Sequence, residues 1–193
     1  MSDLLYLHGF LSSPQSVKAQ ATAQWFAQHR PHIRLHIPQL SNFPGKVKAQ
    51  LDDYLAAHPE LTAQGLKVIG SSMGGYLASY LVEQHGGRAV LINPAVRPYE
   101  LLLGYVGNHV NPYTQEPFSI VNEDMDRLQQ LDTPLLKHPE NYLVLLQTGD
   151  ETLDYRQAQQ KYQASQLHIE QGGDHSFVNY SNQLPKIARF LAV

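Results

Sequence analysis

Short apolar runs alternate along the chain with stretches in which apolar residues recur every three or four positions. The first pattern is typical of buried strands and the second of amphipathic helices. Strands are expected at residues 4–7, 33–37, 66–69, 89–92, 142–147 and 167–169. Helical faces are expected to include Val17, Ala21 and Trp25; Val47, Leu51 and Leu55; Met73, Leu77 and Leu81; Tyr155, Ala158 and Tyr162; and Leu184, Ile187 and Leu191. Helices between strands require right-handed crossovers, so the pattern predicts a six-stranded, mostly parallel sheet with helices on both faces.

Residues 96–141 interrupt this regularity. The segment contains Pro98, Gly104, Pro112 and Pro117, and no strong periodicity spans it. It is too long for an ordinary connection in a compact domain. We expect a helical, lid-like excursion over one face of the sheet, within one α/β domain at residues 1–193. A poorly structured insertion with no role is the alternative.

The most informative stretch is residues 66–80, LKVIGSSMGGYLASY. A β-branched run precedes Gly70, Ser72 and Gly74, and helical spacing follows them. This is the strand–turn–helix context of the Gly-x-Ser-x-Gly nucleophile elbow, in which the turn presents the serine hydroxyl above the sheet. The alternative is an ordinary Gly/Ser-rich turn. Ser71 is a second possible nucleophile, but only Ser72 is centred between the two glycines.

Two further chemical groups follow later strands. Asp150 comes after residues 142–147, and His175 comes after the last predicted strand. Ligands of open parallel sheets bind outside the carboxyl ends of the strands, so Ser72, Asp150 and His175 are expected to converge there. The order Ser…Asp…His is that of the α/β-hydrolase triad: His175 would take the serine proton, and Asp150 would orient the imidazole.

The same edge should hold the donors for an oxyanion. The backbone N–H of Met73, directly after the nucleophile, is one expected donor, and that of Phe10, in the loop after the first strand, is the second. His8, just before this loop, is interpreted as a structural ring.

Rival residues have other interpretations. Asp154 lies four residues past its strand and suits a helix cap, whereas Asp174 suits a turn before His175. His32 and His36 are four residues apart, but Pro31 and the strand pattern argue against the helix that would align them, so no metal or other cofactor is expected. Lid residues Tyr105, Asn111, Pro112, Tyr113 and Phe118 could line a pocket or pack within the lid.

Composition excludes several classes of protein. The net charge is −3, which offers no broad basic surface for nucleic acid. There is no cysteine, which excludes disulfides, thiolate metal sites and a cysteine nucleophile. The N-terminal residues lack a basic region and a long apolar segment, so no signal peptide is expected, and no apolar run has the length of a membrane span. A cytoplasmic protein without membrane insertion is therefore expected, with its oligomeric state undetermined.

The combination of LLYLHGFLSSP, GSSMGGYLA, INPAVRP, NPYT, LLQTGDETLDYRQA and GGDHSF resembles the YqiA-like esterases of the α/β-hydrolase superfamily over nearly the whole chain. The resemblance implies a cofactor-free serine hydrolase of acyl esters that acts through Ser72, Asp150 and His175. Compared with the wider superfamily, the sequence opens directly on the strand before the oxyanion loop, so a sheet without the usual first two strands is expected. Two alternatives stay open: a thioesterase or carbon–carbon bond hydrolase with the same triad, and a catalytically inactive binding module.

Overall fold

A computed structural model describes residues 2–193 of the protein. Its main sheet has six parallel strands in the order β2-β1-β3-β4-β7-β8. The strands are β1 (Ser2–Leu7), β2 (Ile33–His36), β3 (Leu66–Ser71), β4 (Gly87–Ile92), β7 (Tyr142–Gln147) and β8 (Gln166–Glu170). The predicted six-stranded parallel sheet is confirmed.

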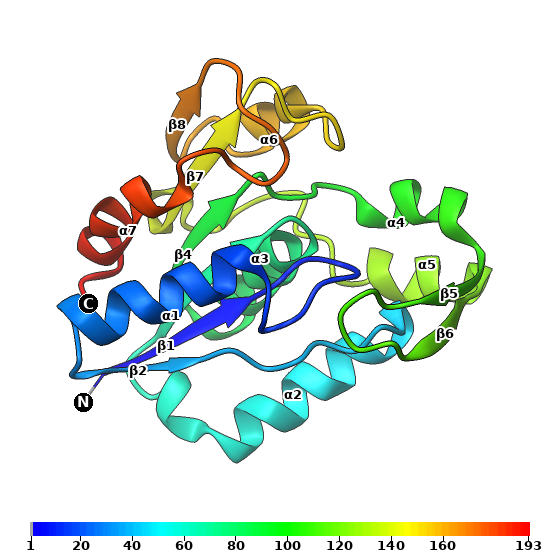
Figure 1. Cartoon of the computed structure of the whole chain (residues 1–193), viewed down its shortest axis with the longest axis horizontal. Helices are drawn as coiled ribbons and strands as arrows, with labels where there is room; N and C mark the ends of the chain where they lie inside the picture. The colour runs from blue at the N-terminus through cyan, green and yellow to red at the C-terminus, as the bar shows by residue number, and fades with distance from the viewer. Residues whose placement is uncertain (1) are drawn as a thin grey trace.

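Helices cover both faces of this sheet (Figure 1). One face packs against α2 (Val47–Ala57), α3 (Met73–His85) and α6 (Tyr155–Lys161), and the other against α1 (Val17–His29) and α7 (Leu184–Leu191). Helix α5 (Asn122–Gln129) adds Met125 and Leu128 to the first of these two cores. Alternate residues of each strand supply the two cores: Leu5 and Leu7 of β1 face the first set, and Leu4 and Tyr6 face the second. This follows from the two-residue period of a strand that is buried on both faces.

The predicted buried face of α1 is only partly right. Val17 is 84% exposed, whereas Ala21 and Trp25 are half-buried and pack against the core. The fully buried residues of the helix are Ala19, Thr22 and Phe26. Burial of Thr22 is possible because its hydroxyl bonds to the backbone oxygen of Lys18 and to the hydroxyl of Tyr180. A polar residue therefore occupies a core position, and a count of apolar residues alone misplaces the face.

The segment at residues 96–141 is only partly helical. It contains α4 (Pro98–Leu101) and α5, joined through an antiparallel pair of strands, β5 (Gly107–Val110) and β6 (Pro117–Ile120), that the sequence analysis did not predict. Elements α4, β5, β6 and α5 lie beyond the carboxyl end of β1 (Figure 1). β5 is largely exposed and lacks the apolar alternation that identifies a strand. β6 does alternate and buries Phe118 and Ile120, but four residues are too few for the pattern to stand out in the sequence.

No helix within residues 2–193 combines the length and apolar character that crossing a bilayer requires.

Candidate active site

Ser72 occupies a strained turn between β3 and α3. Its backbone angles are φ 57° and ψ −120°, a region that non-glycine residues rarely adopt and that costs about 1–3 kcal/mol. Backbone hydrogen bonds hold the turn: the Ser72 N–H donates to the backbone oxygen of Ile92, and the backbone oxygen of Ser72 accepts from the N–H groups of Gly75 and Ala95. The surrounding backbone thus fixes the position of the Ser72 side chain.

The glycines of the motif allow the backbones to approach closely. A Cβ at Gly74 would lie 2.0 Å from the backbone oxygen of Leu7, and one at Gly70 would lie 2.3 Å from the backbone oxygen of Gly74. Helix α3 can therefore begin against β1 only because these positions lack side chains.

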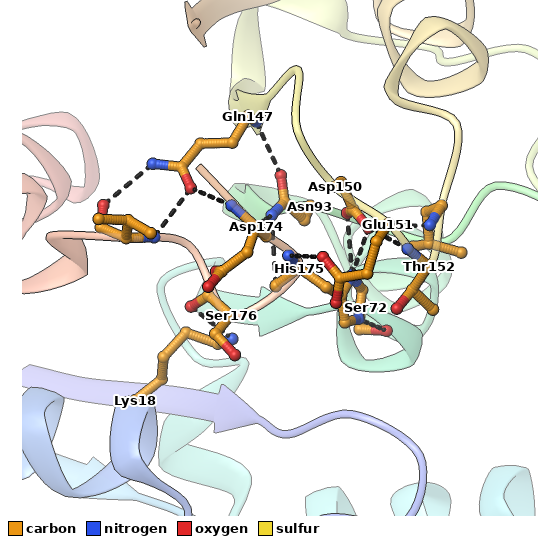
Figure 2. Close-up of polar contacts among 12 residues, drawn as sticks. Lys18, Ser72, Asn93, Gln147, Asp150, Glu151, Thr152, Asp174, His175 and Ser176 are labelled. Atoms are coloured by element: carbon orange, nitrogen blue, oxygen red, sulfur yellow. Dashed lines mark hydrogen bonds and ion pairs between the residues drawn. The ribbon is translucent and has the colours of Figure 1, made fainter. Parts of the chain in front are cut away.

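The structure brings Ser72, His175 and Asp150 into one hydrogen-bonded chain (Figure 2). His175 Nε2 lies 3.1 Å from Ser72 Oγ, and His175 Nδ1 lies 2.8 and 3.0 Å from the two carboxylate oxygens of Asp150. Each residue comes from the loop after a different strand: Ser72 follows β3, Asp150 follows β7 and His175 follows β8. The three side chains that were expected to converge therefore lie within hydrogen-bond distance of one another.

Asp150 is well ordered by hydrogen bonds. Its side chain is 2% exposed, whereas that of His175 is 23% exposed. Besides the imidazole, Asp150 Oδ1 accepts from the N–H groups of Thr152 and Leu153 at 2.9 and 2.8 Å. A buried carboxylate with these donors has a fixed orientation, and it requires the Nδ1–H tautomer of His175, which leaves Nε2 as an acceptor toward Ser72.

Glu151 supports the same loop. Its carboxylate accepts from the backbone N–H of His175 at 3.0 Å. This hydrogen bond is the main reason that the pKa of Glu151 lies below its ordinary value. Glu151 therefore contributes to the backbone position of the histidine.

Two residues that the sequence analysis did not assign also position the histidine loop. Asn93, directly after β4, donates to the backbone oxygens of Asp174 and His175 and accepts from the N–H of Gln147. Gln147, the last residue of β7, accepts from the N–H groups of Asp174 and Val178. Their only signal in the sequence is that each is a polar residue at the carboxyl end of a buried strand.

The rival residues have other contacts. Asp154 caps α6 by accepting from the N–H of Arg156. Asp174 Oδ1 is buried with no hydrogen-bond partner among residues 2–193. Ser71 is the last residue of β3, and the imidazole of His175 contacts Ser72 beside it.

His8 lies under the site as a buried ring. Its Nδ1 contacts the backbone oxygen of Gly9, and its Nε2 accepts from the N–H of Leu40. These partners fit a neutral imidazole, and burial lowers the pKa of His8 from 6.5. The ring therefore connects the loop after β1 to the chain after β2.

The expected oxyanion donors lie beside Ser72. Met73 is the first residue of α3, where N–H groups have no partner within the helix. Phe10 follows Gly9, at which an added Cβ would lie 3.3 Å from Ser72 Cβ. The Phe10 ring packs edge-on against Tyr105 and Phe118 of the 96–141 segment.

The expected lid residues divide between the two interpretations. Tyr105 and Phe118 pack on Phe10, whereas Tyr113 lines the cavity next to Ser72. Asn111 is fully buried, and its side chain donates to the backbone oxygen of Ser12. The 96–141 segment is therefore attached to the loop that carries Phe10.

One group of side chains elsewhere has donors suited to a metal. Asp3, His36 and Glu60 offer ligand atoms within 4.8 Å of one another. Arg34 already contacts Asp3 at 3.6 Å and Glu60 at 3.4 Å, and His36 Nε2 lies 2.9 Å from Asp3 Oδ1. These contacts account for the group as an ion-pair network at the β2 edge of the sheet.

Comparison with solved structures places the fold. A proposed hydrolase from Agrobacterium vitis S4 superimposes with a TM-score of 0.72 at 18% identity, covering 98% of this chain and 88% of that one. Est1E of Butyrivibrio proteoclasticus bound to ferulic acid gives 0.69 at 11% identity, covering 100% and 88%. A methylesterase from Arabidopsis gives 0.66 at 11% identity, covering 100% and 99%. The protein therefore has the α/β-hydrolase fold.

The sequence itself identifies the family. Residues 3–192 match the uncharacterised protein family UPF0227. The chain belongs to this family, and the predicted YqiA-like membership is confirmed.

Proposed function

We propose that the protein is a serine esterase that hydrolyses carboxylic esters through an acyl-enzyme intermediate. The observation that carries the proposal is the hydrogen-bonded chain from Asp150 through His175 to Ser72, with Ser72 in a strained turn at the start of a helix. A serine hydroxyl is a weak nucleophile at neutral pH, and a base in hydrogen-bond contact activates it. The esterase neighbours of the same fold agree with this chemistry.

In the first half of the reaction Ser72 Oγ attacks the ester carbonyl carbon, and its proton moves to His175 Nε2. Asp150 stabilises the imidazolium that forms. The negative oxygen of the tetrahedral intermediate accepts hydrogen bonds from the N–H groups of Phe10 and Met73, helped by the positive end of α3. The carbon–oxygen bond to the alcohol then breaks, and His175 returns the proton to the leaving alcohol.

In the second half, water attacks the acyl-enzyme while His175 accepts one of its protons. The bond between Ser72 Oγ and the acyl carbon breaks, the acid leaves, and the proton returns to Ser72. No cofactor takes part in this sequence, and the substrate is a small-molecule acyl ester.

Ser72→Ala tests the proposal, with Ser71→Ala as the matched control. With 4-nitrophenyl acetate, Ser72→Ala should lose at least about a thousandfold in kcat, because loss of a catalytic serine removes the nucleophile. Ser71→Ala should retain turnover. Turnover by folded Ser72→Ala at the wild-type rate would refute the proposal.

A further inference from the structure

A cavity of about 590 Å³ adjoins Ser72 and His175. Its walls come from the loop after β1, the beginning of α1 and the segment that follows His175. Its volume lies within the range of small-molecule sites. It is therefore the space in which a part of the ester bound at Ser72 would lie.

The lining of this cavity combines apolar and polar surface. Hydroxyl and amide side chains contribute much of it: Ser12, Ser16, Ser176, Asn179, Ser181 and Asn182. Lys18 is the only lysine or arginine among the lining residues, and no aspartate or glutamate lines the cavity within the described chain. Lys18 is therefore the one lysine or arginine side chain that a molecule bound in this cavity meets among the described residues.

Lys18 is close to the reacting groups. It lies on the first turn of α1, and its Nζ donates to the backbone oxygen of Ser176, the residue after His175 (Figure 2). This acceptor carries no charge. Burial lowers the pKa of Lys18, although the carboxylates of Asp174 and Asp150 act in the opposite direction. The ammonium group is thus incompletely compensated by the protein, and an additional negative charge nearby would stabilise it.

We propose that the cavity selects esters that carry a carboxylate, and that Lys18 is the residue that recognises this carboxylate. The inference rests on the proposed esterase function, because it assigns a substrate class to the same site. A carboxylate next to Lys18 would form a charge-assisted hydrogen bond, while the surrounding hydroxyl and amide groups would solvate its remaining oxygen lone pairs. An uncharged ester of the same shape would gain neither.

Two pairs of esters test the proposal, because either side of the ester bond could enter the cavity. One pair carries the charge on the acyl side: 4-nitrophenyl hydrogen adipate and its primary amide. The other carries it on the alcohol side: 4-acetoxybenzoate and 4-acetoxybenzamide. The measured quantity is the ratio of kcat/KM for acid over amide, normalised to the rates of hydroxide-catalysed hydrolysis.

Wild-type enzyme should favour the acid in at least one pair by about five- to tenfold, the size expected of one partly desolvated charge-assisted contact. In Lys18→Met this ratio should fall to about one, whereas Lys18→Arg should retain most of it. Lys48→Met is the matched control: Lys48 is half-exposed on α2, where it pairs with Asp52, and its loss changes net charge equally. This control should keep the wild-type ratio.

The proposal is overturned if wild-type enzyme shows no preference in either pair. It is also overturned if Lys18→Met keeps the preference, or if Lys48→Met loses it too. Because Lys18 also bonds to the Ser176 backbone, Lys18→Met could lower both rates; only a change in their ratio supports recognition of charge. If Lys18→Met fails to fold, the acid-over-amide ratios of the wild-type enzyme decide, and ratios near one in both pairs overturn the proposal. Failure to hydrolyse any of the four esters would instead contradict the esterase function itself.

Discussion

Asn93 donates from its side-chain nitrogen to the backbone oxygen of His175, 82 residues further along the chain, at 3.3 Å. The same nitrogen lies 3.0 Å from the oxygen of Asp174, and Asn93 Oδ1 lies 3.0 Å from the N–H of Gln147. Asn93 has φ 39°, in the left-handed region that asparagine tolerates better than most residues. One side chain thus joins the ends of β4 and β7 to the histidine loop.

Asn93→Ala should therefore lower kcat by about ten- to a hundredfold with little change in KM, because small displacements of a catalytic group are costly. The free energy of unfolding should fall by about 1–3 kcal/mol, since the N–H of Gln147 loses its buried acceptor. Ester hydrolysis and urea unfolding measure the two effects. Asn108→Ala, in the exposed strand β5, should change neither quantity appreciably. Equal loss of activity in both variants would contradict a positioning role for Asn93.

Asp150→Asn should lower kcat by about 10²–10⁴-fold, because the neutral amide neither stabilises an imidazolium nor enforces the Nδ1–H tautomer of His175. Asp154→Asn is the matched control, since Asp154 caps α6 and asparagine is an equally good cap. Steady-state kinetics on one chromogenic ester measures both. A larger loss in Asp154→Asn than in Asp150→Asn would reverse the assignment of the acid.

Gly74→Ala should destabilise the protein by about 3 kcal/mol or more. The new Cβ would meet the backbone oxygen of Leu7 at 2.0 Å, and backbone atoms cannot move aside as a side chain can. Gly104→Ala introduces a Cβ with nothing within 4 Å and should be nearly neutral. Chemical denaturation distinguishes the two. Equal stabilities would show that β1 and α3 do not approach as closely as described.

The buried ring of His8 predicts a pH dependence of stability. Its pKa in the folded state is lowered by burial, so between pH 6.5 and that lower value the unfolded chain binds more protons. The His8 contribution is complete above about pH 6.5 and is lost as the pH falls toward the folded pKa. His8→Ala should be less stable at pH 7.5, but its stability should fall less between pH 7.5 and 5.5. Urea unfolding at both pH values tests this, and an equally steep loss in the variant would exclude His8 as a source.

The sheet was predictable because its strands are buried on both faces. Strand β7 (Tyr142–Gln147), for example, is buried at every position, and its first five residues form an unbroken apolar run in the sequence. The approximate location of the candidate site was predictable for the same reason, because Ser72, Asp150 and His175 each come after an apolar run of this kind. Parallel strands bring these ends to one edge whatever the details of the connecting helices.

Other features depend on contacts that a local pattern does not contain. Thr22 is buried because Tyr180 supplies a hydrogen-bond partner from 158 residues away. The β5 and β6 strands are four residues each, and Phe118 of β6 is buried because Phe10 and Phe43, from distant parts of the chain, pack against its ring. The roles of Asn93 and Gln147 likewise become visible only when the histidine loop is placed over them.

Covalent labelling tests the central claim most directly. A fluorophosphonate probe should react once per molecule, and tandem mass spectrometry should locate the adduct on Ser72, because Ser72 is the hydroxyl in contact with His175 Nε2. Ser71→Ala should label at the same position, and Ser72→Ala should remain unmodified. A folded wild-type protein that stays unlabelled, or an adduct located on Ser71 or another residue, would contradict the proposal that Ser72 is the nucleophile.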